Sequence, residues 1–98
     1  MTGPRSPAQD LLAEVRGDPT GWPALDLHKL LDLWGFAGEA ILDQGRATGV
    51  TFRYHPEHKD LNVALHPVER THAAVALHVV RIIDTLRERR GIFPKRGP

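Results

Sequence analysis

The chain contains no cysteine, so disulfide bonds and zinc sites built on thiolates are excluded. No apolar run approaches the roughly 20 residues that a membrane-spanning helix needs, and the first residues lack the apolar stretch of a signal peptide. We therefore expect a cytoplasmic protein that does not associate with membranes. Phosphate-binding glycine loops, dinucleotide fingerprints, nucleophile elbows and paired catalytic carboxylates are also missing, and we expect no cofactor.

Net charge is also low, because 13 basic and 12 acidic side chains leave only +1. The charge is unevenly spread, however, with a net −4 over residues 1–45 and a net +4 over residues 81–98. The basic C-terminal region is suited to contact the phosphates of a nucleic acid. The alternative is a solvated helix end, where basic side chains also interact favourably with the helix dipole.

Three segments have the periodicity of amphipathic helices. The first is expected to begin at Pro7 with Ser6 as its cap. The second should end at Gly35, and the third should run from about residue 72 to 90. Their apolar stripes consist of Leu27, Leu30, Leu31 and Trp34 in the second helix and Val75, Val79, Ile82, Ile83 and Leu86 in the third.

Between these last two helices, we expect strands at about residues 39–43, 49–55 and 61–66, with a turn at 56–60. The second and third strands alternate apolar and polar residues with a period of two, which indicates a half-buried antiparallel sheet. One side of each strand should face the helices and the other should face water. The expected buried set is Val50, Phe52, Tyr54, Leu61, Val63 and Leu65, and the expected exposed set is Thr51, Arg53, His55, Asn62 and His66.

This order of elements predicts an α+β fold, because neither the helices nor the sheet can bury an apolar side alone. We expect a two-layer sandwich in which a three-stranded antiparallel sheet packs on helices, in the order α-α-β-β-β-α of a double-stranded-RNA-binding domain. The length suits one domain. It should span residues 7–91, after a disordered N-terminus at 1–6 and before a basic tail at 92–98.

Several segments resemble the HicA family of toxins from type II toxin–antitoxin systems. Residues 26–36 (DLHKLLDLWGF) resemble a family helix that ends in a glycine–aromatic pair, and residues 49–56 (GVTFRYHP) are similar to the family's Gly-Ser-His strand. Residues 75–86 resemble the closing helix, and the likeness extends over residues 11–90. The resemblance implies a fold like that of double-stranded-RNA-binding domains, metal-independent endonuclease cleavage of mRNA, and silencing by a HicB-type antitoxin.

The catalytic histidine of that family is missing from its expected place. The matching tripeptide is Gly49-Val50-Thr51 or, one position earlier, Thr48-Gly49-Val50, and neither contains histidine. An imidazole, with a pKa of about 6.5, can take a proton from a ribose 2′-hydroxyl at neutral pH. A threonine hydroxyl stays protonated at that pH, so Thr51 cannot replace it.

The histidines of the expected polar sheet face are the candidates for displaced chemistry. We predict that His55 and His66 supply the acid and base, and that Arg46, Thr51 and Arg53 bind RNA. The alternative for the two histidines is a plain surface position on a solvated sheet. The leading hypothesis is therefore a HicA-like, toxin-related domain that binds RNA.

Two other hypotheses remain open. A catalytically inactive HicA-like domain could keep the fold and bind a protein through the sheet face or the acidic N-terminal half. A zinc site is also conceivable, because His55 and His58 lie three residues apart across a turn and His66 follows. No cysteine accompanies these histidines, and our prediction is that the chain has no metal site.

Overall fold

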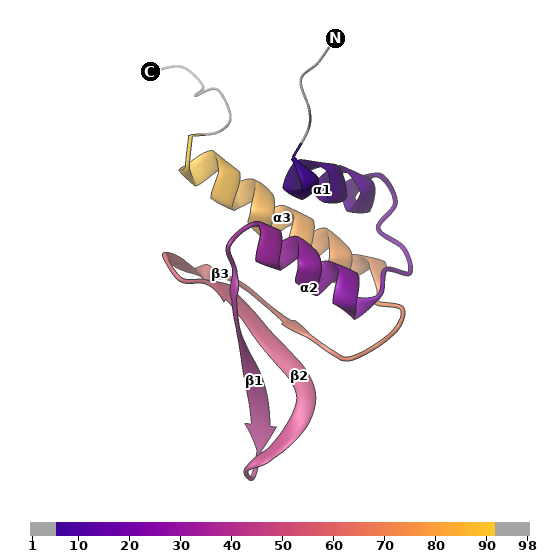
Figure 1. Ribbon diagram of the computed structural model, residues 1–98, viewed down its shortest axis with the longest axis vertical. Helices are drawn as coiled ribbons and strands as arrows, with labels where there is room; N and C mark the ends of the chain where they lie inside the picture. The colour runs from indigo at the N-terminus through magenta and orange to yellow at the C-terminus, as the bar shows by residue number, and fades with distance from the viewer. Residues whose placement is uncertain (1–5, 92–98) are drawn as a thin grey trace.

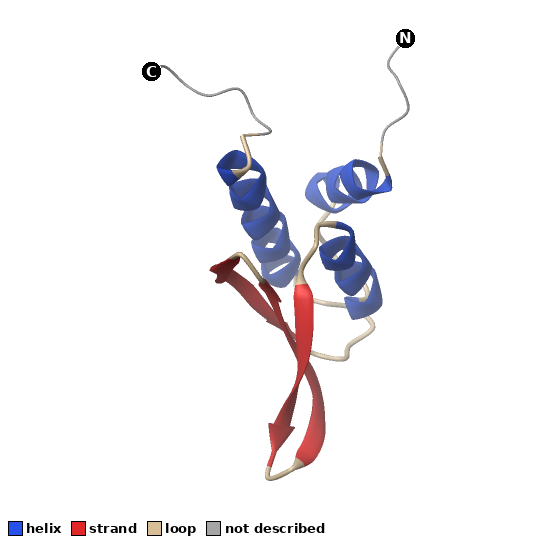
Figure 2. Ribbon diagram, turned by 60° about the vertical axis from the view of Figure 1, so that its left-hand side comes forward, coloured by secondary structure: helices blue, strands red, loops and turns tan. Residues whose placement is uncertain are grey.

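The computed structural model describes residues 6–91 and has the predicted α+β architecture. Its elements are α1 (Pro7–Gly17), α2 (Ala24–Leu33), β1 (Ala37–Asp43), β2 (Arg46–His55), β3 (His58–Leu65) and α3 (Ala73–Arg89). Within this range the strands form one antiparallel sheet in the order β1-β2-β3. The helices lie together beside one part of the sheet, and the β1–β2 hairpin extends away from them (Figures 1 and 2).

The helix ends follow the local sequence. The Ser6 side chain accepts a hydrogen bond from the Gln9 N–H at 3.2 Å, so α1 begins where it was predicted. After α2, Gly35 adopts a φ of +83°, and the Phe36 N–H donates to the Leu31 carbonyl at 3.0 Å. This reversal folds Phe36 back onto α2 and leads the chain directly into β1. Across residues 6–91, no helix has the length and apolar character needed to cross a membrane.

The core lies between the helices and β3. The predicted stripe of α2 is fully buried, and so is that of α3 apart from Val75, which is half-buried against the core. Polar contacts join the helices at its edges, because Trp34 Nε1 donates to the Ala8 carbonyl at 3.2 Å and Arg16 forms an ion pair with Asp84. The helix layer is therefore packed as the apolar periodicity predicted.

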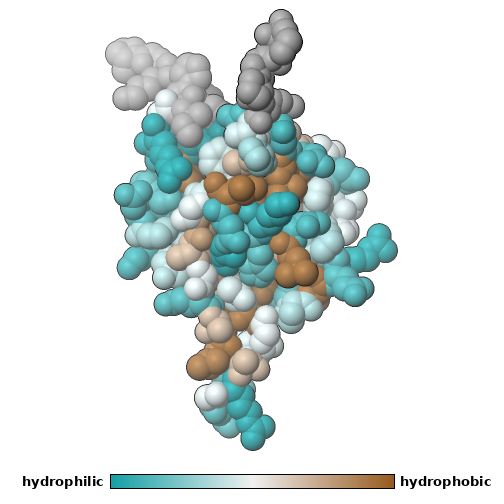
Figure 3. Space-filling view, viewed as in Figure 1, coloured by the Kyte–Doolittle hydropathy of each residue, from teal (hydrophilic) through white to brown (hydrophobic). Residues whose placement is uncertain are grey.

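The β1–β2 hairpin is longer and more exposed than predicted. Its turn consists of Gln44 and Gly45, which both have positive φ angles, as a tight two-residue hairpin turn requires. Almost all of β1 and the first part of β2 are exposed, including Ile41 and Leu42. In Figure 3 this projecting hairpin carries hydrophobic surface above a hydrophilic tip.

The predicted orientation of β2 is wrong. Arg53 and His55 are only 6% and 2% exposed and face the helices, whereas they were expected to face water. The three apolar residues of β3 are buried as predicted, and Arg53 lies directly opposite one of them, Val63. The residues of β2 that lie half-exposed on the other face are Val50, Phe52 and Tyr54.

The register between β2 and β3 causes this inversion. The pairs Thr51–Leu65 and Arg53–Val63 join odd-numbered residues to odd-numbered residues. The apolar residues have even numbers in β2 and odd numbers in β3, so the two apolar sets fall on opposite faces. The connecting turn is also shorter than expected, because β3 already begins at His58 and the register shifts between Tyr54 and His55.

Candidate functional site

Arg53 joins three elements beneath the helices. Its Nε donates to the Ala37 carbonyl at 3.1 Å, and one Nη donates to the Phe36 carbonyl at 3.0 Å and also contacts the Asp32 carboxylate. The other Nη lies 2.8 Å from His28 Nδ1. A planar guanidinium with several donors in a fixed fork suits such a set of acceptors. Arg53 therefore ties the end of α2 to β1, and it does not face water as the sequence led us to expect.

His28 takes part in the same network from α2. Its pKa is lowered, first by burial and then by the charge of Arg53, while the Asp32 carboxylate acts in the opposite direction. The neutral ring can accept the hydrogen bond from Arg53 at Nδ1. The network around Arg53 is therefore a structural clamp whose donors are already directed at protein acceptors.

His55 lies at the end of β2, beneath the last turn of α3. Its ring and that of Phe36 form a T-shaped pair with centroids 5.3 Å apart, and Arg90 Nη2 lies 3.0 Å from Nε2. The backbone N–H of Glu57 donates to Nδ1 at 3.1 Å. Burial lowers the pKa of His55, the charges of Arg90 and His58 lower it further, and Glu57 opposes them.

The surroundings of the His55 ring contain one donor too many. A neutral imidazole has a single acceptor nitrogen, and both the Glu57 N–H and the Arg90 guanidinium approach the ring as donors. Whichever tautomer is present, one of these contacts is between two donors. An oxygen atom of an anion would supply the acceptor that this arrangement lacks.

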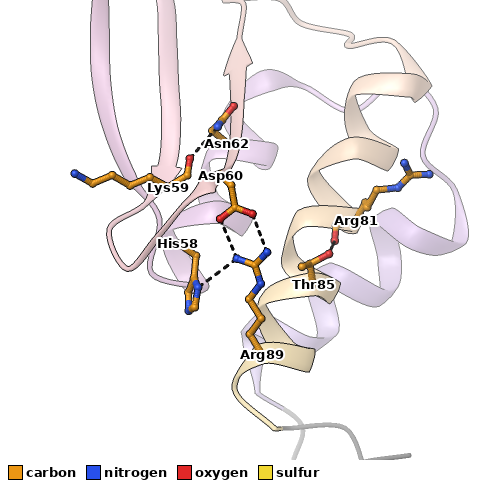
Figure 4. A network of polar contacts seen from close by, with 7 residues as sticks. All are labelled: His58, Lys59, Asp60, Asn62, Arg81, Thr85 and Arg89. Atoms are coloured by element: carbon orange, nitrogen blue, oxygen red, sulfur yellow. Dashed lines mark hydrogen bonds and ion pairs between the residues drawn. The ribbon is translucent and has the colours of Figure 1, made fainter.

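His58 and Arg89 extend this group toward solvent. The rings of His55 and His58 lie 5.3 Å apart, and Arg89 Nη1 lies 3.3 Å from His58 Nδ1 (Figure 4). Arg89 also makes two hydrogen bonds to the Asp60 carboxylate, at 2.9 and 2.7 Å, which lower the pKa of that acid. We call His55, His58, Arg89 and Arg90 the histidine–arginine cluster.

The remaining predicted site residues lie elsewhere. His66 is exposed just beyond β3, at the end of the β2–β3 pairing that is far from His55. Arg46 is exposed on the projecting hairpin opposite Asp43, and Thr51 is half-buried on the helix-facing side. The structure therefore does not bring the predicted catalytic pair together. Thr51 lies opposite Leu65 and so near His66, Arg53 lies near His55, and Arg46 lies away from both histidines.

Three residues of the cluster were missed by reasoning from the sequence. His58 was placed in the turn at 56–60 and considered only as a zinc ligand, and Arg89 and Arg90 were part of the basic C-terminal region. The signal that could have found His58 is the dipeptide Pro56-Glu57, which is short enough for a tight turn and so places the flanking histidines side by side. No sequence pattern indicated that the end of α3 would lie over that turn.

In the described range 6–91, no group of three or more histidine, aspartate or glutamate side chains could hold a metal ion, so the zinc alternative finds no support there. Comparisons with protein-family models, with curated proteins and with solved structures find no match for this chain. The resemblance to HicA toxins therefore rests on the sequence features alone.

Proposed function

We propose that this protein is a HicA-like, toxin-related domain that binds RNA, and that the histidine–arginine cluster holds a phosphate of the RNA backbone. The observation that supports this proposal is the excess of donors at His55 and Arg90. A phosphodiester oxygen accepts hydrogen bonds readily from arginine and from imidazole N–H groups. Arg90 is exposed and meets the ligand first, while buried His55 offers the second donor behind it.

One cation of the cluster, Arg90, suits an anionic ligand. Asp60 is paired with Arg89 and the charge of Glu57 acts on His55, whereas Arg90 forms no ion pair with another residue of the described range. Binding of one phosphate releases counterions from the RNA, so the affinity contributed by this contact should fall with salt with a log–log slope of about −0.7.

The test is the affinity of the full chain for a short, unstructured, fluorescently labelled RNA, measured by anisotropy at low salt. Arg90→Ala should weaken binding about tenfold, the equivalent of about 1.4 kcal/mol for one charged hydrogen bond. Arg81→Ala is the matched control, because Arg81 is an exposed arginine of the same helix that points away from the cluster (Figure 4). Equal losses in both variants, or no binding by the unaltered chain, would refute the proposal.

The same cluster favours a second candidate function, metal-independent RNA cleavage, because it contains two neighbouring imidazoles. For cleavage, unlike phosphate holding, the His55 ring would need the tautomer whose lone pair is on Nε2; the lowered pKa favours the neutral ring, which would take the proton from a ribose 2′-hydroxyl at that atom. The 2′-oxygen then forms a bond to phosphorus, the bond from phosphorus to the 5′-oxygen breaks, and His58 gives a proton to that leaving oxygen. The products are a 2′,3′-cyclic phosphate and a 5′-hydroxyl end.

Cleavage is tested with end-labelled RNA in the presence of a chelator. His55→Asn, which keeps an acceptor for the Glu57 N–H, and His58→Asn should each slow cleavage by at least about a hundredfold. His66→Asn is the control, since this exposed histidine lies away from the cluster. Loss of cleavage in His66→Asn alone would restore the catalytic role predicted from the sequence, and no cleavage by the unaltered chain would remove the second candidate without affecting the first.

A HicB-type antitoxin is the protein partner that the resemblance predicts. The projecting hairpin, with exposed Ile41 and Leu42, supplies apolar surface of the kind that protein partners cover. Co-expression with the product of a short neighbouring gene, followed by co-purification, tests this partner. An Ile41→Ser/Leu42→Ser variant should no longer co-purify with the antitoxin and should still bind RNA.

A further inference from the structure

The face of the sheet opposite the helices carries a pair of aromatic rings that the histidine–arginine cluster does not use. Phe52 and Tyr54 lie two residues apart on β2, and Arg53 between them points to the other face. Their ring centroids are 5.7 Å apart and their planes are inclined by 27°, so the rings are stacked. Both side chains are half-exposed.

The neighbours of the two rings on this face leave them accessible. Phe52 lies between Glu39 and Ala64 in the sheet, and Tyr54 lies between Ala37 and Asn62. An alanine is too short to cover a neighbouring ring, so each aromatic residue has one flank open. The face therefore offers two adjacent aromatic surfaces beside a carboxylate and an amide.

We propose that this face is a stacking platform for the unpaired bases of single-stranded RNA, an inference that rests on the RNA binding proposed above. Aromatic rings stack on any base, and this contributes strongly to the binding of single strands. Glu39 lies beside Phe52 and Asn62 lies beside Tyr54 in the sheet. Because Asn62 Nδ2 donates to the Lys59 carbonyl at 2.9 Å, these two side chains offer oxygen acceptors to the amino groups of bases. His55, the residue after Tyr54, faces the helices on the other side of the sheet, so an RNA strand that uses both sites would pass around the β2–β3 turn between the platform and the cluster.

Two double variants distinguish the contribution of aromatic stacking to RNA affinity from that of apolar side-chain volume. F52L/Y54L keeps apolar side chains but removes the aromatic faces, and it should weaken binding of a short single-stranded RNA at least about tenfold. F52Y/Y54F keeps both rings and should bind within about twofold of the unaltered chain. Circular dichroism and thermal unfolding of each variant verify that the fold is retained.

A second measurement needs no substitution at the platform. Tyr54 is the single tyrosine of the chain, so incorporation of 3-fluorotyrosine gives one fluorine resonance that reports on this ring. The resonance should shift on addition of the single-stranded RNA. It should stay in place with a blunt duplex of the same sequence, whose bases are already stacked and paired.

The outcomes distinguish the platform from the function on which it rests. Absence of RNA binding by the unaltered chain would remove both. Binding that depends on Arg90 but is unchanged in F52L/Y54L, with no shift of the fluorine resonance, would remove only the platform. A dimer in sedimentation that F52L/Y54L dissociates would show that a second copy covers this face, and would also overturn the platform.

Discussion

The face of the sheet that packs on the helices buries two polar side chains of β2, Arg53 and His55, whereas the opposite face holds the aromatic residues of the same strand. Arg53 is buried at low cost because its donors reach the carbonyl groups of Ala37 and Phe36 and the side chains of α2. Phe52 and Tyr54 lie half-exposed without a covering element in the described part of the chain. The comparison shows that hydrogen-bond partners can decide which side of a strand is buried.

The largest expected effect comes from comparing a phenylalanine of the core beneath the helices with one on the open face of the sheet. Phe36→Ala removes a core ring that is 5% exposed, and it should lower the free energy of unfolding by about 3–5 kcal/mol. Phe52→Ala removes a half-exposed ring that stacks on Tyr54, and it should cost only about 1 kcal/mol. Urea unfolding measures both values. Equal losses would mean that the two faces are not different environments.

The second-largest expected effect concerns the contribution of buried Arg53 to the free energy of unfolding. Arg53→Ala should lower the free energy of unfolding by about 3 kcal/mol, because it leaves buried carbonyl groups without donors. Arg53→Lys keeps the charge but cannot make the forked contacts, so its loss should be smaller yet still measurable. If Arg53→Ala were as stable as the unaltered chain in the same urea titration, the clamp would have no energetic role.

The smallest effect is a dependence of stability on pH. The pKa values of His28 and His55 are lowered in the folded chain, so the unfolded chain binds more protons in the window below the ordinary histidine pKa of about 6.5. Stability should therefore be complete above that pH and decrease as the pH falls toward the lowered values. Unfolding curves at several pH values should show this slope, and His28→Asn/His55→Asn should flatten it.

Much of the fold was predictable because the apolar periodicity of a helix, which shows its buried side, can be read from residues close together in the sequence. The stripe of α2, the cap at Ser6 and the reversal at Gly35 each depend on residues within a few positions of one another. The burial of β3 followed in the same way from its alternation. These features need no knowledge of the rest of the chain.

The site was far less predictable, because it depends on the β2–β3 register and on the place where α3 ends. One residue of slip would have buried Phe52 and exposed Arg53, and the alternation of β2 alone does not distinguish the two registers. Gly49 is a second example. It matches the glycine of the HicA-family Gly-Ser-His motif, but the structure gives a reason for glycine here that is independent of catalysis. Its φ is +84°, and a Cβ atom at this position would lie 2.9 Å from Pro67 Cγ, so the backbone and the available space both require glycine.

The sequence by itself therefore determined the number, order and kind of the elements, because apolar periodicity and turn residues act over short distances. Only the tertiary structure decided which histidines and arginines lie together. His55 meets His58 through a turn and Arg90 through the packing of α3 against β3, contacts between residues up to 35 positions apart. Such contacts depend on the register and on the core as a whole, and no local pattern encodes them.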